Sequence, residues 1–505
     1  MGEKIGLFLE RLLLVLYHVM IFGILGLLMF AGKIGYSEYH KRSFIFPNPI
    51  LGLIGIAAFC LLLFLFYKLR NIKLNFLVIS LILFVISTVT MLLSMYGVGW
   101  DAGTVVDDAY NVAIGNEISG DYYSTYPNNM LTFVIYANIF KAAVRFGITD
   151  KSAVCAIAVV FNCILFYLIG LMLYSILKKS IREKWLVAFG VFLYFVFVQM
   201  SPWTFVLYSD STGILFPVLV LWLYLVIDTN NAVITGLKAV LILFTSICGY
   251  YVKATTIFVF MGIVVVEFIN MLRSRKKLNS IVFILIAVLL FIPGYKICDK
   301  AKVVTFEKTS ATQYNSELTL TFWHWLMIGL NKDSDGTFNF DDAELSAWIS
   351  SSDERVSRNK SEIKSRISEL GVKGLSELYV HKLLINYNDG TFENGVEGAD
   401  SISEEYFEDN VFNGISRYFL RPDKPGFIIY MDIAQVIWLG ILFFAFWINS
   451  KDKSGKILMI SLMGITLFTM IFEAQQRYLF LYTPIYVLAA CIGISNILGL
   501  SRHKQ

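Results

Sequence analysis

The sequence predicts an all-α polytopic membrane protein with about twelve transmembrane helices. Of its 505 residues, 57% are hydrophobic and only 16% are charged, which leaves too little polar surface for a soluble fold of this length. The apolar residues also fall into runs of about 17 to 25, the length that a helix needs to cross the hydrocarbon core. Lys and Arg gather in alternate connections between these runs. Together these observations predict a chain that crosses a membrane repeatedly.

The predicted spans are residues 9–31, 48–67, 74–97, 152–177, 184–200, 209–227, 232–250, 255–273, 280–298, 426–448, 456–474 and 478–499. The first run has no small-residue cleavage site, so it predicts a retained span and not a signal peptide. Basic residues cluster at 67–73, 177–184, 273–277, 450–456 and the C-terminus. Because such residues stay on the cytoplasmic side, we expect a multi-pass protein of the plasma membrane with both termini in the cytoplasm.

This topology divides the chain into four parts. Residues 1–73 form two N-terminal spans, 74–299 a transmembrane core with the external loop 97–151, 300–425 a second external segment, and 426–505 the C-terminal spans. Residues 130–147 are apolar but carry Lys141 and Arg145, which predicts a helix at the external interface and not a further span. The segment 300–425 has helical spacing of apolar residues among charges and predicts a mostly helical subdomain on the outer surface.

The external side carries a small set of residues that could take part in catalysis or in substrate binding. Asp101, Asp107 and Asp108 follow the span 74–97 directly. A carboxylate can act as a general base towards a hydroxyl group, although any one of the three is equally explained as a solvated loop residue. Lys253 and Arg477 stand at external ends of spans, where they either bind a phosphate or anchor the helix at the interface. A base and a phosphate clamp together suggest group transfer from a phosphorylated donor.

Other function classes lose support. There is no Walker loop, no H-E-x-x-H and no convincing G-x-S-x-G, which argues against ATP-driven transport and zinc proteolysis. His324 lies among aromatic residues and is predicted to pack there, so no metal-binding residue is predicted. Carboxylates with water nevertheless suit Mg²⁺ or Mn²⁺. The net charge of +4 is explained by the topology, and no nucleic-acid partner is predicted.

Four stretches carry a family resemblance: WDAGTVVDDA (100–109), YYSTYPNNM (122–130), YVKATTIF (251–258) and EAQQRYLFLYTP (473–484). With the span pattern, they resemble the bacterial C-type membrane glycosyltransferases that use polyprenyl-phosphate sugars. This group is similar to the protein mannosyltransferase and aminoarabinose transferase superfamily. The resemblance covers most of residues 74–499, and no single motif is diagnostic. Two spans precede the aspartate-bearing one, whereas many members begin with it.

The resemblance implies an enzyme that moves a hexosyl or pentosyl group from a polyprenyl-phosphate donor to a glycan, teichoic acid or lipid of the cell envelope. It places the catalytic base on Asp101, with Asp107 and Asp108 as alternatives. It implies that the donor phosphate is held by Lys253 and Arg477. Substrate-binding roles fall on Tyr126, Asn128, Asn129 and Asp210. Asp210 also fits a plain helix N-cap, since Asp is favoured there.

Two other functions stay open. A transporter or flippase of a lipid-linked glycan would also be polytopic, but we expect a carrier to keep ionisable residues near the middle of its spans. These spans are almost free of them. An envelope polysaccharide polymerase would take a lipid-linked oligosaccharide in place of a monosaccharide. Neither the sugar nor the acceptor follows from the sequence.

Overall fold

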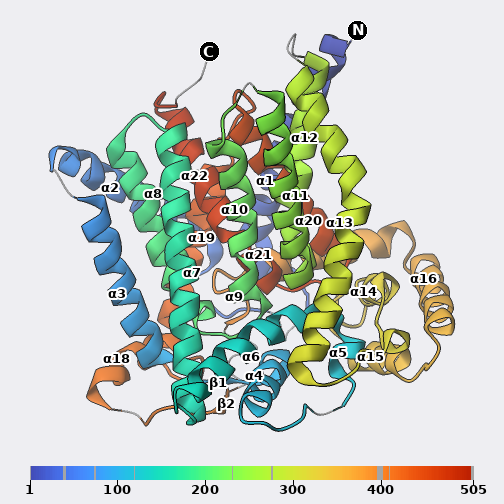
Figure 1. Ribbon diagram of the computed structural model, residues 1–505. Helices are drawn as coiled ribbons and strands as arrows, with labels where there is room; N and C mark the ends of the chain where they lie inside the picture. Colours follow the sequence, from blue (N-terminus) through green and yellow to red (C-terminus); the bar gives the residue numbers. More distant parts are fainter. Residues whose placement is uncertain are drawn as a thin grey trace.

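The computed structural model describes residues 2–37, 41–72, 75–118, 120–229, 231–273, 277–394, 402–408 and 410–501, and the features below concern those residues. Long helices stand side by side in one bundle (Figure 1). The described strands are β1 (Gly97–Val98) and β2 (Ile402–Glu404), which pair antiparallel with Gly97 opposite Glu404 and Val98 opposite Ile402. The prediction of an all-α protein is therefore confirmed.

Ten described helical segments are long and apolar enough to cross a membrane, as a polytopic membrane protein requires. They are α1 with η1 (Gly2–Lys33), α2 with η2 (Asn48–Asn71), α3 (Phe76–Ser94), α7 (Lys151–Ser180), α9 with α10 (Ser209–Val226), α11 (Ala232–Val252), η6 with α12 (Ala254–Arg273), α13 (Leu278–Ser310), α19 (Phe427–Ala445) and α20 (Lys453–Ile471). The predicted spans 184–200 and 478–499 correspond to shorter apolar helices, α8 with η4 (Lys184–Gln199) and α22 (Thr483–Ile497). Twelve crossings therefore remain a prediction.

Helix α22 lies at the centre of the bundle. All its residues from Thr483 to Ser495 are buried, and it packs against α7, α8, α19 and α20. The approach of α19 requires a glycine, because a Cβ added at Gly493 would lie 1.9 Å from the carbonyl oxygen of Phe444. The segment just before α22 contains α21 (Arg477–Phe480), which contributes to the candidate site.

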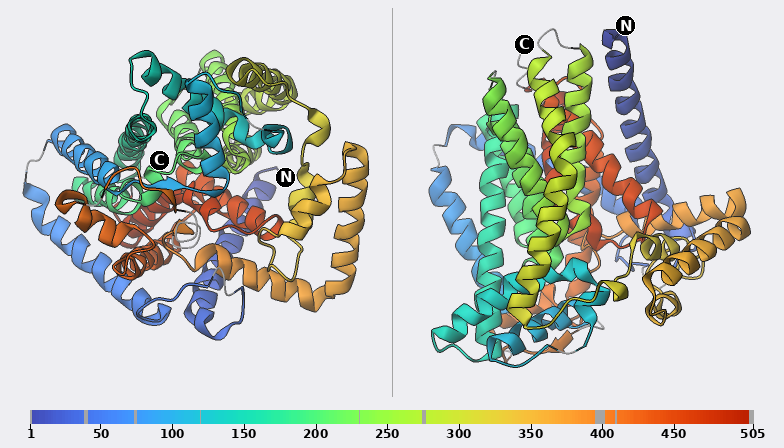
Figure 2. Two further views of the ribbon diagram at one scale, coloured as in Figure 1. Left: turned by 90° about the horizontal axis from the view of Figure 1, so that it is seen from below. Right: turned by 45° about the vertical axis from the view of Figure 1, so that its right-hand side comes forward.

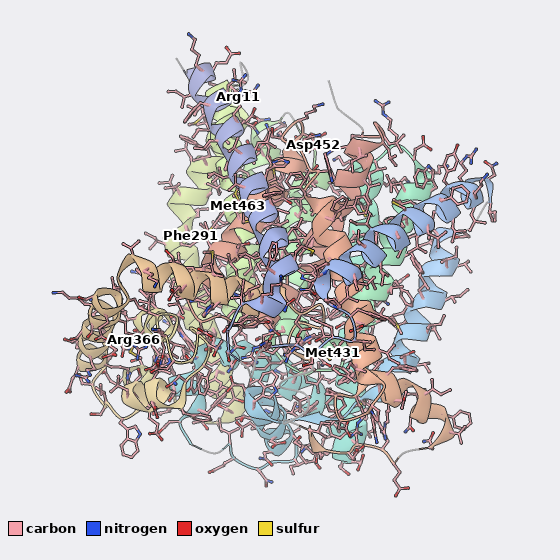
Figure 3. The ribbon with its side chains drawn as sticks, turned by 180° about the vertical axis from the view of Figure 1, so that it is seen from behind. Arg11, Phe291, Arg366, Met431, Asp452 and Met463 are labelled. Carbon is pink, nitrogen blue, oxygen red and sulfur yellow. The ribbon has the colours of Figure 1, made fainter. Side chains whose placement is uncertain are left out.

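The short helices α4 (Trp100–Ala113), α5 (Tyr122–Thr125) and α6 (Met130–Arg145) lie at the end of the bundle opposite both termini (Figure 1). Seen from that end, they lie across the long helices (Figure 2). Figure 3 labels Arg11 and Asp452 at the end with the termini and Met431 in the opposite half. Helix α6 is the segment predicted to lie at the interface. It packs on α4, α7 and α13, and its position relative to a membrane remains a prediction.

The segment 300–425 forms several separate elements and not one subdomain. Its first residues continue α13 to Ser310. Next, α14 (Phe322–Ile328), α15 (Phe340–Ala347) and α16 (Ser352–Tyr387) enclose a small separate core that includes Met327, Leu330, Ile363 and Leu378. Helix α16 bends at Gly371, whose φ of +57° suits glycine. Residues 388–393 form bends and turns, and α18 (Val411–Leu420) follows the strand β2.

Residues 388–394 are buried inside the bundle, which the sequence did not predict for a polar, turn-like stretch. Trp203 Nε1 donates to the carbonyl oxygens of Thr391 and Phe392 at 3.1 and 3.0 Å. The Asp389 carboxylate accepts from the backbone of Thr391 at 2.7 Å and forms an ion pair with Arg42 at 3.0 Å. These contacts satisfy the polar groups that burial would otherwise penalise.

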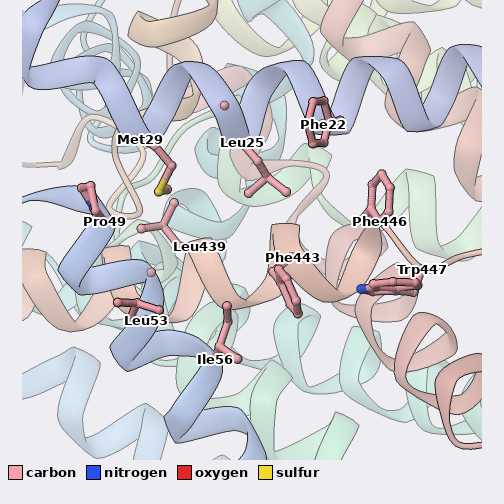
Figure 4. Close-up of a pocket in the computed structure, with 12 residues that line it drawn as sticks. Phe22, Leu25, Met29, Pro49, Leu53, Ile56, Leu439, Phe443, Phe446 and Trp447 are labelled. Atoms are coloured by element: carbon pink, nitrogen blue, oxygen red, sulfur yellow. The ribbon is translucent and has the colours of Figure 1, made fainter.

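An apolar pocket of about 450 Å³ lies between α1, α2 and α19 (Figure 4). Its lining is Phe22, Leu25, Gly26, Met29, Pro49, Gly52, Leu53, Ile56, Leu439, Phe443, Phe446 and Trp447. Several of these side chains, such as Phe22 and Leu53, are exposed on the bundle surface. The lining offers no carboxylate, amine or hydroxyl group for chemistry, so the candidate site is elsewhere.

Candidate functional site

Asp101 is held at the N-terminus of α4. The helix begins at Trp100, whose φ of +48° turns the chain out of the short strand β1, and Asp101 occupies the first turn. A carboxylate is favourable there because the helix dipole is positive at this end. Its Oδ1 accepts a hydrogen bond from the Tyr122 hydroxyl at 2.7 Å, and Oδ2 accepts a longer one from Tyr208 at 3.3 Å. Two phenols therefore fix the orientation of this carboxylate.

The segment 122–129 supports this arrangement. Asn129 Nδ2 donates to the Tyr122 oxygen at 2.6 Å, and Asn128 Nδ2 donates to Asn129 Oδ1 at 3.2 Å. Burial raises the pKa of Tyr122 above its usual range, and the nearby Tyr208 and Asp101 raise it further. The hydroxyl therefore stays protonated and donates to Asp101. Asn129 is therefore linked to the Asp101 carboxylate through Tyr122, and Asn128 is linked to it through Asn129 and Tyr122.

Tyr126 lies at the edge of the same group. Its ring centre is 5.3 Å from that of Tyr122 and 6.4 Å from that of Trp325 in α14. Burial raises the pKa of Tyr126, with smaller contributions from Asp101 and Glu473. Tyr126 thus lies between the aspartate and the small core of α14 to α16.

Arg477 contacts an aromatic wall formed by Trp100 and Tyr208, and Tyr208 also contacts Asp101. It is the first residue of α21 (Arg477–Phe480), and its guanidinium carbon lies 4.5 Å from the ring centre of Trp100 and 5.8 Å from that of Tyr208. Trp100 and Tyr208 meet edge to face at 4.9 Å. An Arg guanidinium commonly stacks on aromatic faces in this way. The cation and the carboxylate therefore share one partner, Tyr208.

Lys253 is paired with a buried carboxylate. It follows α11, and its Nζ forms an ion pair with Asp210 Oδ1. The Asp210 side chain is 0% exposed and that of Lys253 is 11% exposed. Lys253 also lies 4.7 Å from the ring centre of Tyr478 and 6.0 Å from that of Tyr208. The cation is thus held inside the protein, and much of its charge is balanced by Asp210.

The prediction that Asp210 caps a helix N-terminus is wrong. The N-cap residue of α9 (Ser209–Gly213) is Tyr208, and Asp210 lies inside the first turn. Its Oδ2 has no hydrogen-bond partner among the described residues. Asp210 therefore contributes through its ion pair with Lys253, and one of its oxygens faces no protein donor in the described part of the chain.

Two buried glutamates near Arg477 were missed by the sequence analysis. Glu473 Oε2 accepts from the Tyr478 hydroxyl at 2.7 Å, and the amide of Gln475 lies between Glu473 and Glu393. Burial raises the pKa of Glu473, which Tyr478 and Arg477 partly oppose. Glu393 approaches the Arg477 backbone N–H at 3.5 Å from the buried loop 388–394. The polar break EAQQR between two apolar runs was the available signal for Glu473; Glu393 had none.

Asp107 and Asp108 lie in different surroundings from Asp101. Asp107 is exposed and pairs with Lys151 at 2.9 Å, and Lys151 also pairs with Glu404 at 2.7 Å. Asp108 is buried and lies against Tyr123, whose pKa is raised by burial first and then by this carboxylate. The structure therefore brings Asp101, and neither of its two neighbours, into hydrogen-bond contact with Tyr122 and Tyr208.

His324 is packed in the α14 to α16 core, as the sequence predicted. Its Nδ1 lies 2.8 Å from Ser346 Oγ, and burial lowers its pKa to about 4. No group of three or more His, Cys, Asp or Glu is placed to hold a metal ion anywhere in the described ranges. The candidate site is thus a carboxylate, two cations and an aromatic wall.

A family model described as "conserved hypothetical integral membrane protein" matches residues 51–497. The chain belongs to this family. No curated protein and no solved structure matches it. For a member of an integral membrane family, buried ionisable groups are costly and usually serve a function. The segments that meet around Tyr208 contribute Asp101, Asp210, Lys253 and Arg477 from distant parts of the chain.

Proposed function

We propose that the protein is a membrane glycosyltransferase that moves a sugar from a polyprenyl-phosphate donor to an acceptor on the outer face of the plasma membrane. The observation that carries this proposal is the shared partner Tyr208. Its hydroxyl donates to Asp101, and its ring lies 5.8 Å from the Arg477 guanidinium carbon and 6.0 Å from Lys253 Nζ. A base and a cationic group are the two parts that sugar transfer from a phosphate donor needs.

In the proposed reaction, the acceptor hydroxyl oxygen attacks the anomeric carbon of the donor sugar. The bond between that carbon and the phosphate oxygen breaks, and the polyprenyl phosphate leaves with the electron pair. Asp101 takes the proton of the acceptor hydroxyl. Tyr122 and Tyr208 orient its carboxylate and leave further lone pairs of the carboxylate to accept this proton.

Arg477 is assigned to the phosphate of the donor. Its planar guanidinium can bind two phosphate oxygens at once and stabilises the charge that grows on the leaving group. Lys253 has a different part, because Asp210 already balances much of its charge. We assign Lys253 to positioning and to the positive potential of the site. Buried atoms without a partner among the described residues, Trp100 Nε1 and Asp210 Oδ2, are left for polar groups of a substrate.

The transporter alternative finds less support. A carrier is expected to hold ionisable groups near the middle of its spans. In the described chain, Glu10 of α1 is paired with Arg273 and Lys456, and Glu267 of α12 lies 3.7 Å from Lys453. Lys453 and Lys456 lie at the first turn of α20, next to Asp452 at the terminus end in Figure 3. These carboxylates are thus neutralised close to one end of the bundle.

The proposed orientation predicts which positions are accessible outside the cell. Glu117 and Lys364 are exposed and belong to the two proposed external segments, and Lys451 is exposed in a proposed cytoplasmic loop. Cysteines at Glu117 and Lys364 should react with a membrane-impermeant thiol reagent in intact cells. A cysteine at Lys451 should react only after lysis, and the unaltered chain gives the background. The reverse pattern would place the candidate site in the cytoplasm and end the proposal.

Arg477→Gln should lower the transfer rate or the donor affinity by at least about tenfold, equivalent to 1.4 kcal/mol. The reason is that Gln keeps hydrogen-bonding ability and loses the charge that faces the leaving phosphate. Kinetics with varied donor would measure the effect. Arg477→Lys keeps the charge without the planar fork, so its rate should lie between those of Arg477→Gln and the unaltered chain. Normal kinetics for Arg477→Gln would leave the residue as a packing element only.

A further inference from the structure

Helix α18 (Val411–Leu420) has its polarity reversed relative to a helix on a soluble protein surface. Its large apolar side chains point outward: Val411 is 89% exposed, Phe412 83% and Ile415 74%. Its polar side chains point inward, and Asn413 and Arg417 are only 2% and 1% exposed. Tyr418 and Phe419 are also exposed. Exposure of this apolar face to water would be unfavourable in free energy.

The inward polar face is well satisfied, so the orientation of α18 is fixed. Arg417 Nε donates to the carbonyl oxygen of Leu93 at 3.2 Å, and its Nη2 donates to that of Phe407 at 2.8 Å. Asn410 and Asn413 form a capping box at the N-terminus of the helix. Turning the apolar face inward would break these bonds and pull Arg417 out of its buried position.

The neighbours of α18 place it at a membrane boundary. Leu93 belongs to the last turn of α3, a candidate span that ends at Ser94. The next candidate span of the chain, α19, begins at Phe427, only a short connection after Leu420. In Figure 1, α18 lies beside the lower end of α3, the end opposite the termini. The helix thus lies where two spans leave the hydrocarbon core.

We propose that α18 binds the lipid bilayer as an interfacial helix, with Val411, Phe412 and Ile415 inserted among the acyl chains near the headgroups. The bilayer is the one partner that already surrounds the adjoining ends of α3 and α19. An amphipathic helix in the interface plane buries its apolar face at this depth. This proposal does not depend on the reaction assigned to Asp101.

Membrane binding by α18 also has a structural consequence for the candidate site. Arg421, next to the helix, pairs with Glu405, which directly follows strand β2. Strand β2 pairs with β1, and β1 ends at Val98, just before Trp100 and Asp101. The lipid-bound helix therefore tethers the chain that starts α4 and fixes its height relative to the membrane surface.

The test uses the full-length protein in vesicles of phosphatidylcholine and phosphatidylglycerol, with an environment-sensitive fluorophore on an introduced cysteine. Cys60, the exposed native cysteine, is replaced by Ser to remove background labelling. The label goes on Ile415→Cys, with Val89→Cys in the span α3 as the lipid control and Lys364→Cys in α16 as the water control; all three positions are exposed. Quenching is measured with nitroxide lipids and with iodide in the buffer.

We expect nitroxide lipids to quench the label at Ile415 to about the degree seen at Val89, and several-fold more than at Lys364. Iodide should show the opposite order. Quenching at Ile415 that matches Lys364 would show a water-facing helix and overturn the proposal. Quenching by neither agent would show that protein covers the face, which overturns it equally. Phe412→Cys repeats the test on the same face in case one label disturbs the helix.

Discussion

Asp101→Asn should lower the rate of sugar transfer by about 10² to 10⁴, because positioned acid-base catalysis is typically worth that much. Asn keeps the size of the side chain, and its one carbonyl oxygen can still accept a hydrogen bond from Tyr122 or from Tyr208. It cannot take the proton of the acceptor hydroxyl. The measurement is the transfer rate in membranes with matched amounts of protein.

Asp107→Asn and Asp108→Asn are the controls, since they lie on the same helix. Asp107 is exposed in a surface ion pair with Lys151, so its replacement should leave the rate near that of the unaltered chain. Asp108 is buried against Tyr123, and its replacement should act through the amount of folded protein and not through the rate per molecule. An active Asp101→Asn variant beside an inactive Asp108→Asn variant would move the base to Asp108.

Lys253→Met should lower the free energy of unfolding by about 3 to 5 kcal/mol, the usual cost of removing one partner from a buried ion pair. The reason is that Asp210, whose side chain is 0% exposed, would keep its charge without a counterion. The double variant Lys253→Met with Asp210→Asn should recover much of the loss, because no uncompensated charge is left. Thermal unfolding of the purified protein in detergent would compare both variants with the unaltered chain.

The pair of Lys373 and Glu377 provides a matched control on the surface. These side chains are 92% and 53% exposed, and their charged atoms are 3.9 Å apart. Lys373→Met should therefore change stability little. If Lys253→Met were as stable as the unaltered chain, the charge of Lys253 would not be needed inside the fold. A phosphate-binding role for Lys253, in place of positioning, would then regain support.

The membrane-spanning helices were predictable because a span needs one continuous apolar run, and that signal is local. The long helices α1, α2, α3 and α7 therefore match the predicted runs closely. The loop 388–394 was not predictable, because its polar groups are satisfied by distant partners such as Trp203 and Arg42. A polar sequence indicates exposure only when no such partners exist elsewhere in the chain.

The candidate site shows the same limit. Asp101, Lys253 and Arg477 could be named from the sequence because each interrupts or ends an apolar run. That Lys253 pairs with Asp210, and that Tyr208 lies between the aspartate and both cations, depends on the packing of α9 against α11 and α21. Glu393 lies at the site because residues 388–394 are buried. Nothing near Glu393 in the sequence distinguishes it from a turn residue.

The most direct measurement of the proposed function is mass spectrometry of the polyprenyl-phosphate lipids in cells whose copy of the protein carries Asp101→Asn. It does not require the sugar to be known in advance. We expect one polyprenyl-phosphate monosaccharide to accumulate, and the same sugar to disappear from an envelope glycan. Accumulation of a lipid-linked oligosaccharide would indicate a polymerase instead. Unchanged lipids together with an unchanged envelope would contradict transfer from a polyprenyl-phosphate sugar.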